Sequence, residues 1–317
     1  MISLFHKSKQ YLLVALKVLI LAATFWYIYV KLKATNAKTF DAFQEAFDIE
    51  GPYLFYYGIH FLLLAILNWF FEILKWKTVV SFLDRISFKK ALKQTLAALT
   101  ISLATPSRVG DYGAKALFYA PEKRKQILVL NFFSNGAQML TTLIFGLYGL
   151  FYVWMHYDLQ LSILNLVLLL IVALLLGFLG YLFKEKELIV KGFSVGNVIR
   201  YYKKLGASIQ IRTFIYSVIR YGIFSYLFYN LLRFFGVEMP LWDVLPIIFA
   251  MYLLVSIIPS LFIFDVVVRG GVAVWLFSLA GISELPVLST VLCMWILNFV
   301  FPAIWGSFYV ISYKPAS

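Results

Sequence analysis

The sequence predicts an all-α polytopic membrane protein. Hydrophobic residues make up 62% of the 317 residues and charged residues 14%, against about 45–50% and about 25% in soluble domains. The apolar runs are long and continuous, and they lack the two-residue alternation of a membrane β-barrel. The net charge of +13 at pH 7 is explained by cytoplasmic loops that lie against anionic headgroups. We therefore expect no nucleic-acid partner.

Six apolar runs are long enough to span a bilayer. At about 1.5 Å per helical residue, a hydrocarbon core of about 30 Å needs about twenty residues. The six predicted spans, in chain order, are residues 11–32, 52–74, 127–154, 161–183, 213–235 and 287–311.

The distribution of basic residues orients these spans. Six basic residues and one acid lie between residues 75 and 93, and seven basic residues and two acids lie between 184 and 212. The outer loops hold two basic residues, Lys33 and Lys38. Because Lys and Arg collect on the cytoplasmic side, we expect both termini to be cytoplasmic.

A proline divides the stretch between the second and third spans. Residues 92–104 and 109–119 form two apolar arms on either side of Pro106, and each arm is too short to cross. Pro106 cannot continue the helix before it, and basic residues flank both arms. This pattern predicts a re-entrant helical hairpin that enters from the cytoplasm.

The tip of this first hairpin carries three charges. Arg108, Asp111 and Lys115 lie within ATPSRVGDYGAKALFY at spacings of three and four, so they share one helical face. Charges at membrane depth cost about 2.5–3.5 kcal/mol each on insertion scales and usually face protein, water or a ligand. These residues are therefore the first candidates for a functional site.

A second stretch, IPSLFIFDVVVRGG at residues 258–271, has a similar composition. Pro259 interrupts an apolar run, and Asp265 and Arg269 follow four residues apart. We expect a second re-entrant hairpin here, although its longer arms leave open the alternative of two full spans. Either reading preserves the orientation of the other spans, because a hairpin adds an even number of crossings.

The layout predicts one membrane domain, residues 1–317, made of two inverted repeats. The first repeat covers about 1–156 and the second about 157–317, each with two spans, a hairpin and a further span. In transporters, such repeats bring broken helices together near the midplane, where helix N-termini offer donors to anions. We therefore expect the two charged tips to meet there.

Three motifs carry a resemblance to a known family. TPSRVGDYGAK, NWFFEILKW and IPSLFIFDVVVRGG resemble the membrane region of the lysylphosphatidylglycerol synthase and flippase family, which includes stand-alone flippase-like members. The resemblance covers nearly the whole chain, although this chain has Phe264 and Val267 where family members often carry glycines. The matching positions are Pro106, Arg108, Gly110 and Asp111 in the first hairpin and Pro259, Asp265, Arg269 and Gly270 in the second.

The resemblance implies transport of a polar-headed lipid between leaflets, in a bacterial inner membrane and without a cofactor. The partner would be a phospholipid or a lipid-linked substrate. Arg108, Arg269 and Lys115 would bind its phosphate or headgroup, and Asp111 and Asp265 would pair with the cations or couple transport to protons. The alternative is a purely structural role, in which these charges neutralise one another and hold the hairpins together.

Further polar residues interrupt the spans and form a second group of candidates. Each could line a transport path, or simply join helices through hydrogen bonds or ion pairs. These secondary candidates are Glu72, Asn131, Asn135, Gln138 and Arg220. The three histidines are scattered and Cys293 is the single cysteine, so no metal site is expected.

Three classes of function fit the sequence. Lipid transport is favoured. The alternative is a non-transporting membrane partner or scaffold of an enzyme that acts on envelope lipids or glycans. A membrane-embedded transferase is disfavoured because the sequence shows no nucleophile, metal cluster or acidic pair on an outer loop.

Overall fold

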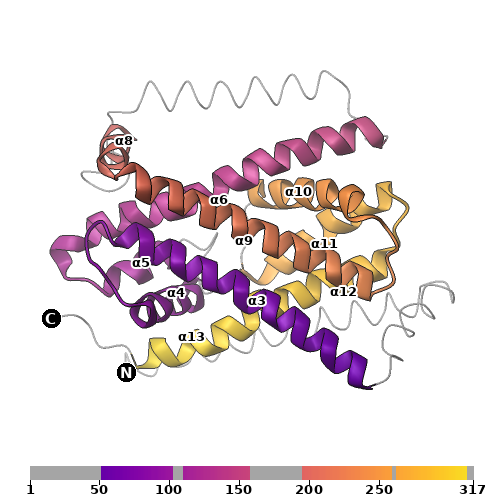
Figure 1. Cartoon of the computed structure of the whole chain (residues 1–317), viewed down its shortest axis with the longest axis horizontal. Coiled ribbons are helices and arrows are strands. Elements are labelled where there is room, and N and C mark those ends of the chain that lie inside the picture. The colour runs from indigo at the N-terminus through magenta and orange to yellow at the C-terminus, as the bar shows by residue number, and fades with distance from the viewer. Residues whose placement is uncertain (1–50, 103–109, 158–194, 259–261, 313–317) are drawn as a thin grey trace, which may run out of the picture.

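The computed structural model describes residues 51–102, 110–157, 195–258 and 262–312 (Figure 1). Within these ranges the regular structure is entirely helical. The helices are α3 (Gly51–Val80), α4 (Phe88–Ser102), α5 (Gly110–Leu117), α6 (Pro121–His156), α8 (Val195–Lys204), α9 (Ala207–Phe234), α10 (Leu241–Ile257), α11 (Phe262–Leu279), α12 (Glu284–Trp295), the π-helical η2 (Ile296–Val300) and α13 (Phe301–Ile311).

Within the described ranges, three helical stretches are long and apolar enough to cross a membrane. They are Tyr53–Val80, Pro121–His156 and Glu284–Ile311, and they coincide with the predicted spans 52–74, 127–154 and 287–311. Helix α9 coincides with the predicted span 213–235. The predicted spans 11–32 and 161–183 lie outside the described residues, so the count of six spans and the sides of the termini stay predictions.

Pairs of short helices occupy both predicted hairpins. Helices α4 and α5 contact each other on either side of residues 103–109, and α10 and α11 do so on either side of residues 259–261. Helix α11 is continuous through positions 264 and 267, so the backbone there needs no glycine. Entry of the hairpins from opposite sides of the membrane, and the inverted repeat itself, remain predictions.

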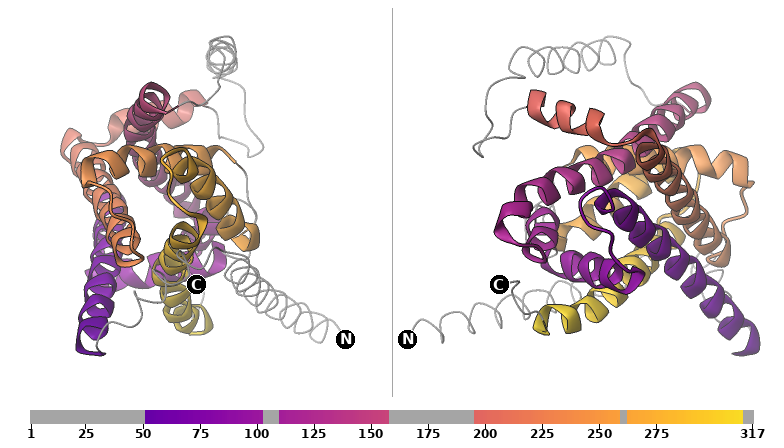
Figure 2. Two further views of the ribbon diagram at one scale, coloured as in Figure 1. Left: turned by 90° about the vertical axis from the view of Figure 1, so that its right-hand side faces the viewer. Right: turned by 60° about the vertical axis from the view of Figure 1, so that its left-hand side comes forward.

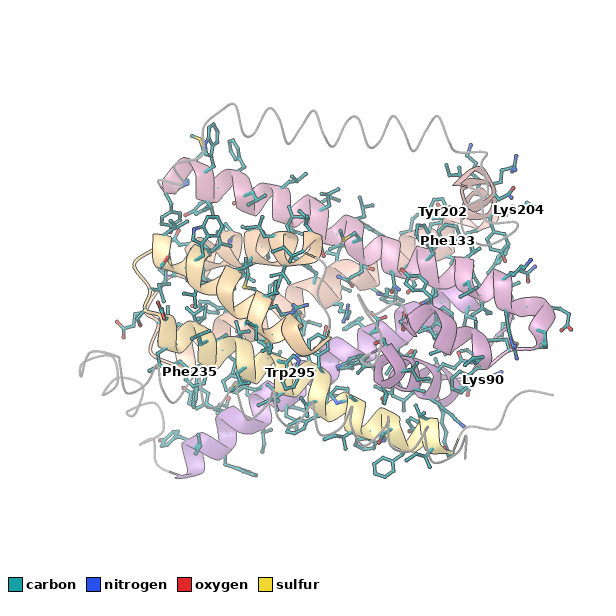
Figure 3. All side chains as sticks on the ribbon, turned by 180° about the vertical axis from the view of Figure 1, so that it is seen from behind. Lys90, Phe133, Tyr202, Lys204, Phe235 and Trp295 are labelled. Atoms are coloured by element: carbon teal, nitrogen blue, oxygen red, sulfur yellow. The ribbon has the colours of Figure 1, made fainter. Side chains whose placement is uncertain are left out.

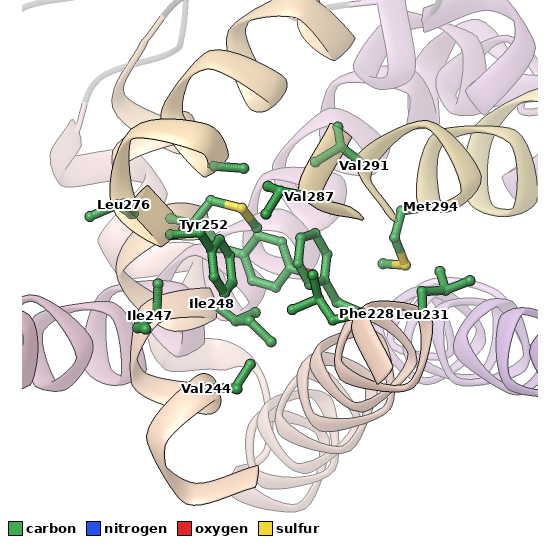
Figure 4. Packing of buried hydrophobic residues seen from close by; sticks show 14 of the residues in the cluster. Phe228, Leu231, Val244, Ile247, Ile248, Tyr252, Leu276, Val287, Val291 and Met294 are labelled. Atoms are coloured by element: carbon green, nitrogen blue, oxygen red, sulfur yellow. The ribbon is translucent and has the colours of Figure 1, made fainter. Parts of the chain in front are cut away.

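Two main hydrophobic clusters stabilise the described part of the bundle, and a minor third one pairs Leu99 with Phe299. The larger one packs α9, α10, α11 and α12 together, with Phe228 and Tyr252 among its buried aromatic residues (Figure 4). The smaller one joins the C-terminal part of α3 to α4, α5 and the start of α6 around the fully buried Trp76. In the view of Figure 3, Phe133 and Tyr202 lie near one end of the molecule and Phe235 lies near the other.

Helices α3 and α6 pass through both clusters. On α3, Ala65 belongs to the larger cluster and Ile73 to the smaller; on α6, the corresponding residues are Val153 and Leu130. The N-terminal turns of α3 project beyond the other coloured helices in three views (Figures 1 and 2). The segments of α3 and α6 between these clusters carry polar residues, among them Glu72 on α3 and Gln138 on α6.

Close helix contacts depend on glycines at two places. The α-hydrogen of Gly149 on α6 faces the backbone of α10, where an added Cβ would meet the Pro246 carbonyl oxygen and the Ala250 nitrogen. Gly306 on α13 faces the Leu96 carbonyl of α4 in the same way. Such small residues let helix backbones approach closely in membranes, where packing rather than the hydrophobic effect drives association.

We predict that Gly149→Ala destabilises the protein by about 1–3 kcal/mol, because the new methyl group would push α10 away from α6. Gly222→Ala on α9 is the matched control, since its added Cβ would meet no atom within 4 Å and alanine favours helix by about 1 kcal/mol over glycine. Thermal unfolding in detergent measures both. Equal midpoints for the two variants would contradict the close α6–α10 contact.

Candidate functional site

One face of α6 carries the polar residues that organise the site. Asn131, Asn135, Gln138 and Thr142 recur at spacings of four, three and four, so they form a stripe along the helix. The stripe lies between the two hydrophobic clusters. Its first two residues contact the first hairpin, and its last two line a cavity.

Lys115 of α5 is enclosed by partners at the first hairpin. Its side chain is 1% exposed, and its Nζ lies 3.3 Å from an Asp111 carboxylate oxygen. The same ammonium donates a hydrogen bond of 2.9 Å to Asn131 Oδ1 and lies 4.7 Å from the centre of the Trp76 ring. A carboxylate, an amide and an aromatic face together replace the hydration that a buried ammonium loses.

Asp111 is also held by the α6 stripe. Its Oδ2 accepts hydrogen bonds from Asn131 Nδ2 at 2.7 Å and from Asn135 Nδ2 at 3.2 Å. The Asp111 carboxylate therefore joins the hairpin helix α5 to α6 by accepting hydrogen bonds from two side-chain amides of α6. This geometry favours the neutralising interpretation of the Asp111–Lys115 pair.

A second buried charge cluster joins α3, α9 and α6. Glu72 Oε2 lies 2.7 Å from Lys75 Nζ and 3.3 Å from Arg220 Nε. Arg220 also donates through Nη1 to Gln138 Oε1 at 3.1 Å. The sequence placed Lys75 in a cytoplasmic segment after the second span, but α3 continues to Val80, and Lys75 is 1% exposed.

A cavity of about 190 Å³ lies beside this cluster and is lined by both halves of the chain. Arg220 and Arg269 both contribute to its wall, and the Arg269 guanidinium lies 5.7 Å from the centre of the Phe299 ring. Its other lining residues are Asn68, Gln138, Thr142, Tyr221, Phe224, Tyr252, Val255, Ser256, Asn298 and Phe299. Two guanidinium groups amid amides and hydroxyls can bind a small anion by charge-assisted hydrogen bonds.

The buried amide pair Asn68–Asn298 borders the cavity and was not among the predicted candidates. Asn68 Nδ2 donates to Asn298 Oδ1 at 2.8 Å across α3 and η2. Asn298 sits in the π-helical turn, a feature frequent at functional sites, and its Nδ2 donates to the Met294 carbonyl at 3.1 Å. An isolated Asn in an apolar span was the available signal, the same one that identified Asn131.

The smaller cluster contains another polar group that the sequence did not single out. Gln94 of α4 is fully buried, and its Oε1 accepts from Trp76 Nε1 at 2.8 Å and from the Tyr119 hydroxyl at 3.1 Å. Trp76 thus receives a hydrogen bond partner at its edge while its face meets Lys115. Gln94 had no distinctive sequence signal, because it follows Lys93 near the start of the predicted hairpin arm at residues 92–104.

Several predicted site residues lie outside the described ranges. Arg108, Pro106 and Pro259 lie outside the described residues, as does the side chain of Asp265. The motif glycines are placed: Gly110 begins α5, and Gly270 of α11 is buried, where an added Cβ would lie 3.1 Å from Leu288.

The predicted meeting of the two charged tips stays a prediction. In the described part, Asp111 and Lys115 contact Asn131 of α6. Arg269 of α11 instead lines the cavity together with Gln138 and Thr142, which lie further along the same face of α6. Asn135 and Gln138, one turn apart, connect these two regions. Across the described ranges, no group of three or more His, Cys, Asp or Glu side chains is placed to hold a metal ion.

Comparison with known proteins identifies a family. A family model described as the lysylphosphatidylglycerol synthase TM region matches residues 14–306. No curated protein and no solved structure matches the chain significantly.

We predict that Asp111→Asn destabilises the protein by about 3 kcal/mol, because it leaves the buried Lys115 without a carboxylate. The double variant Asp111→Asn with Lys115→Met should recover at least half of this loss. Urea or thermal unfolding in detergent measures the free energies. Additive effects of the two substitutions would contradict the pairing.

The exposed pair of Lys90 and Asp84, 3.4 Å apart with side chains 49% and 36% exposed, provides the control. Asp84→Asn should change stability by about 0–1 kcal/mol, as is usual for surface ion pairs.

Proposed function

Because the chain belongs to the lysylphosphatidylglycerol synthase TM-region family, we propose that this integral membrane protein moves a polar-headed lipid between the leaflets of a bacterial inner membrane. The observation that carries the proposal is the cavity lined by Arg220 and Arg269. It is bounded by α3 and α6 of the first predicted repeat and by α9, α10, α11 and η2 of the second. A site between repeats is where transporters of inverted topology bind their substrates.

The chemistry of the cavity suits a phosphate-bearing headgroup. A phosphate that crosses the hydrocarbon core loses its hydration, and guanidinium groups replace it by bidentate, charge-assisted hydrogen bonds. The cavity of about 190 Å³ is smaller than the roughly 300–1,000 Å³ of pockets that enclose drug-sized ligands. In this proposal the headgroup enters the protein while the acyl chains remain in the lipid.

We assign Arg269 to the headgroup and keep Arg108 as its predicted partner. The Asp111–Lys115 pair is assigned to positioning, because its charges are already matched to each other and to the α6 amides. Asp265 keeps its predicted pairing or coupling role. Lys115 would bind a headgroup only if Asp111 released it.

The proposed activity is non-enzymatic, and its partner is a phospholipid or a lipid-linked substrate. The alternative, a non-transporting membrane scaffold, predicts a different result in the experiment below. A scaffold would leave the rate of lipid exchange between leaflets unchanged.

We predict that the purified protein in liposomes accelerates leaflet exchange of a fluorescent phospholipid, and that Arg269→Ala lowers the added rate about tenfold or more through loss of charge-assisted contacts. Arg269→Lys should retain part of the rate, since it keeps the charge without the bidentate geometry. Chemical quenching of the outer-leaflet dye measures exchange.

Arg233→Ala is the matched control, because Arg233 lies exposed in the last turn of α9 and away from the lining of the cavity. It should leave exchange unchanged. Exchange no faster than in protein-free liposomes would overturn the transport proposal and favour the scaffold.

A further inference from the structure

Glu72 is shared by two cations that hold it unequally. Lys75, on the same helix, forms a close ion pair with Glu72 Oε2 at 2.7 Å and has a side chain that is 1% exposed. Arg220 approaches the same oxygen at 3.3 Å from another helix. Its Nε makes no hydrogen bond within the described part of the chain. The Lys75 contact is therefore the tight one, and the Arg220 contact is the one that can be exchanged.

Arg220 is also the member of the cluster that reaches the cavity. Its side chain is 22% exposed, and it lines the wall together with Arg269 and Gln138. The guanidinium carries five N–H donors, and its contacts among the described residues go to Glu72 and Gln138. A ligand in the cavity would therefore meet the guanidinium of Arg220 at the cavity wall.

The charges of the cluster indicate what ligand would fit. Glu72, Lys75 and Arg220 together carry one surplus positive charge, and Arg269 adds a further positive charge to the wall of the same cavity, whereas Asp111 and Lys115 balance each other. An anion in the cavity would offset part of this surplus, and buried charges are stable when they are paired. A phosphodiester carries a single negative charge at neutral pH and offers two oxygens to a guanidinium.

We propose that Arg220 alternates between Glu72 and the phosphodiester monoanion of a lipid headgroup. In the empty site Glu72 holds Arg220 as an internal substitute for the phosphate. When a headgroup enters, Arg220 turns its donors to the phosphate, and Lys75 keeps Glu72 neutralised. Because Glu72 competes with the ligand, it weakens binding and speeds release. This inference rests on the proposed transport function and names the headgroup chemistry for the same site.

The test compares binding of two probes in detergent: a short-chain phosphatidylglycerol, and glycerophosphoglycerol, which has the same phosphodiester without acyl chains. Isothermal titration calorimetry gives the affinities. Arg220→Ala should weaken phosphatidylglycerol binding about tenfold or more. Glu72→Gln should strengthen phosphatidylglycerol binding several-fold, because the competing carboxylate is gone. The same variant should slow lipid exchange in liposomes, because the headgroup is released more slowly.

Glu72→Gln could unfold the protein, since it leaves Lys75 buried without its partner. A second variant therefore tests the inference without this unpaired charge. Glu72→Gln combined with Lys75→Met removes the pair together, keeps Arg220, and should also strengthen binding. Glu238→Gln, at an exposed carboxylate beyond α9, is the control and should leave the affinity unchanged. Unchanged or weaker binding in the folded double variant would overturn the inference.

The remaining outcomes separate this inference from the proposed function. If the wild-type protein exchanges lipid in liposomes but the affinity is unchanged in both Glu72 variants, the alternation is overturned and the transport proposal is kept. Tighter binding in the variants without any wild-type exchange supports the site and overturns transport. Binding of both probes supports recognition of the phosphodiester itself, and binding of phosphatidylglycerol alone supports a lipid as its source.

Discussion

Lys75 and Lys115 are each 1% exposed in a bundle whose walls are mostly aliphatic and aromatic. An ionised group in such surroundings is stable only with an opposite charge and hydrogen-bond partners. Glu72 and Asp111 supply the charges. These carboxylates also draw in groups from other helices, Arg220 of α9 in one case and the amides of α6 in the other. The relative positions of α3, α5, α6 and α9 follow from satisfying these charges.

The same constraint locates the polar layer between two apolar clusters. Along α3 the residues change from aliphatic at Ala65 to polar at Asn68 and Glu72, and the smaller cluster then begins at Ile73, with the buried Lys75 between Ile73 and Trp76. Gln138 lies near the middle of the 36-residue α6 and links this layer to Arg220. A layer that is polar and partly open, with apolar packing on both sides, can hold a headgroup while the bundle remains rigid.

Sequence reasoning succeeded where the signal was local. Long apolar runs predicted α3, α6, α9 and the continuous helix from α12 to α13, because helix formation in a membrane needs only enough apolar residues to span it. Pro106 and Pro259 predict helix breaks because proline removes a backbone donor, but both lie outside the described residues, so these breaks stay predictions. The reasoning was less accurate at the end of α3. Burial of Trp76 and Val80 against α4, α5 and α6 extends that helix beyond the predicted boundary.

The sequence by itself determined the membrane class, the family, and the polar residues that had to find partners, since composition and an unpaired charge in an apolar run are visible in one dimension. Only the tertiary structure decided which partner each residue has. Glu72 and Arg220, or Asn68 and Asn298, lie far apart in the chain, and they meet only because α3 packs against α9 and η2. Contacts between helices arise from the packing of whole surfaces, and no local pattern encodes them.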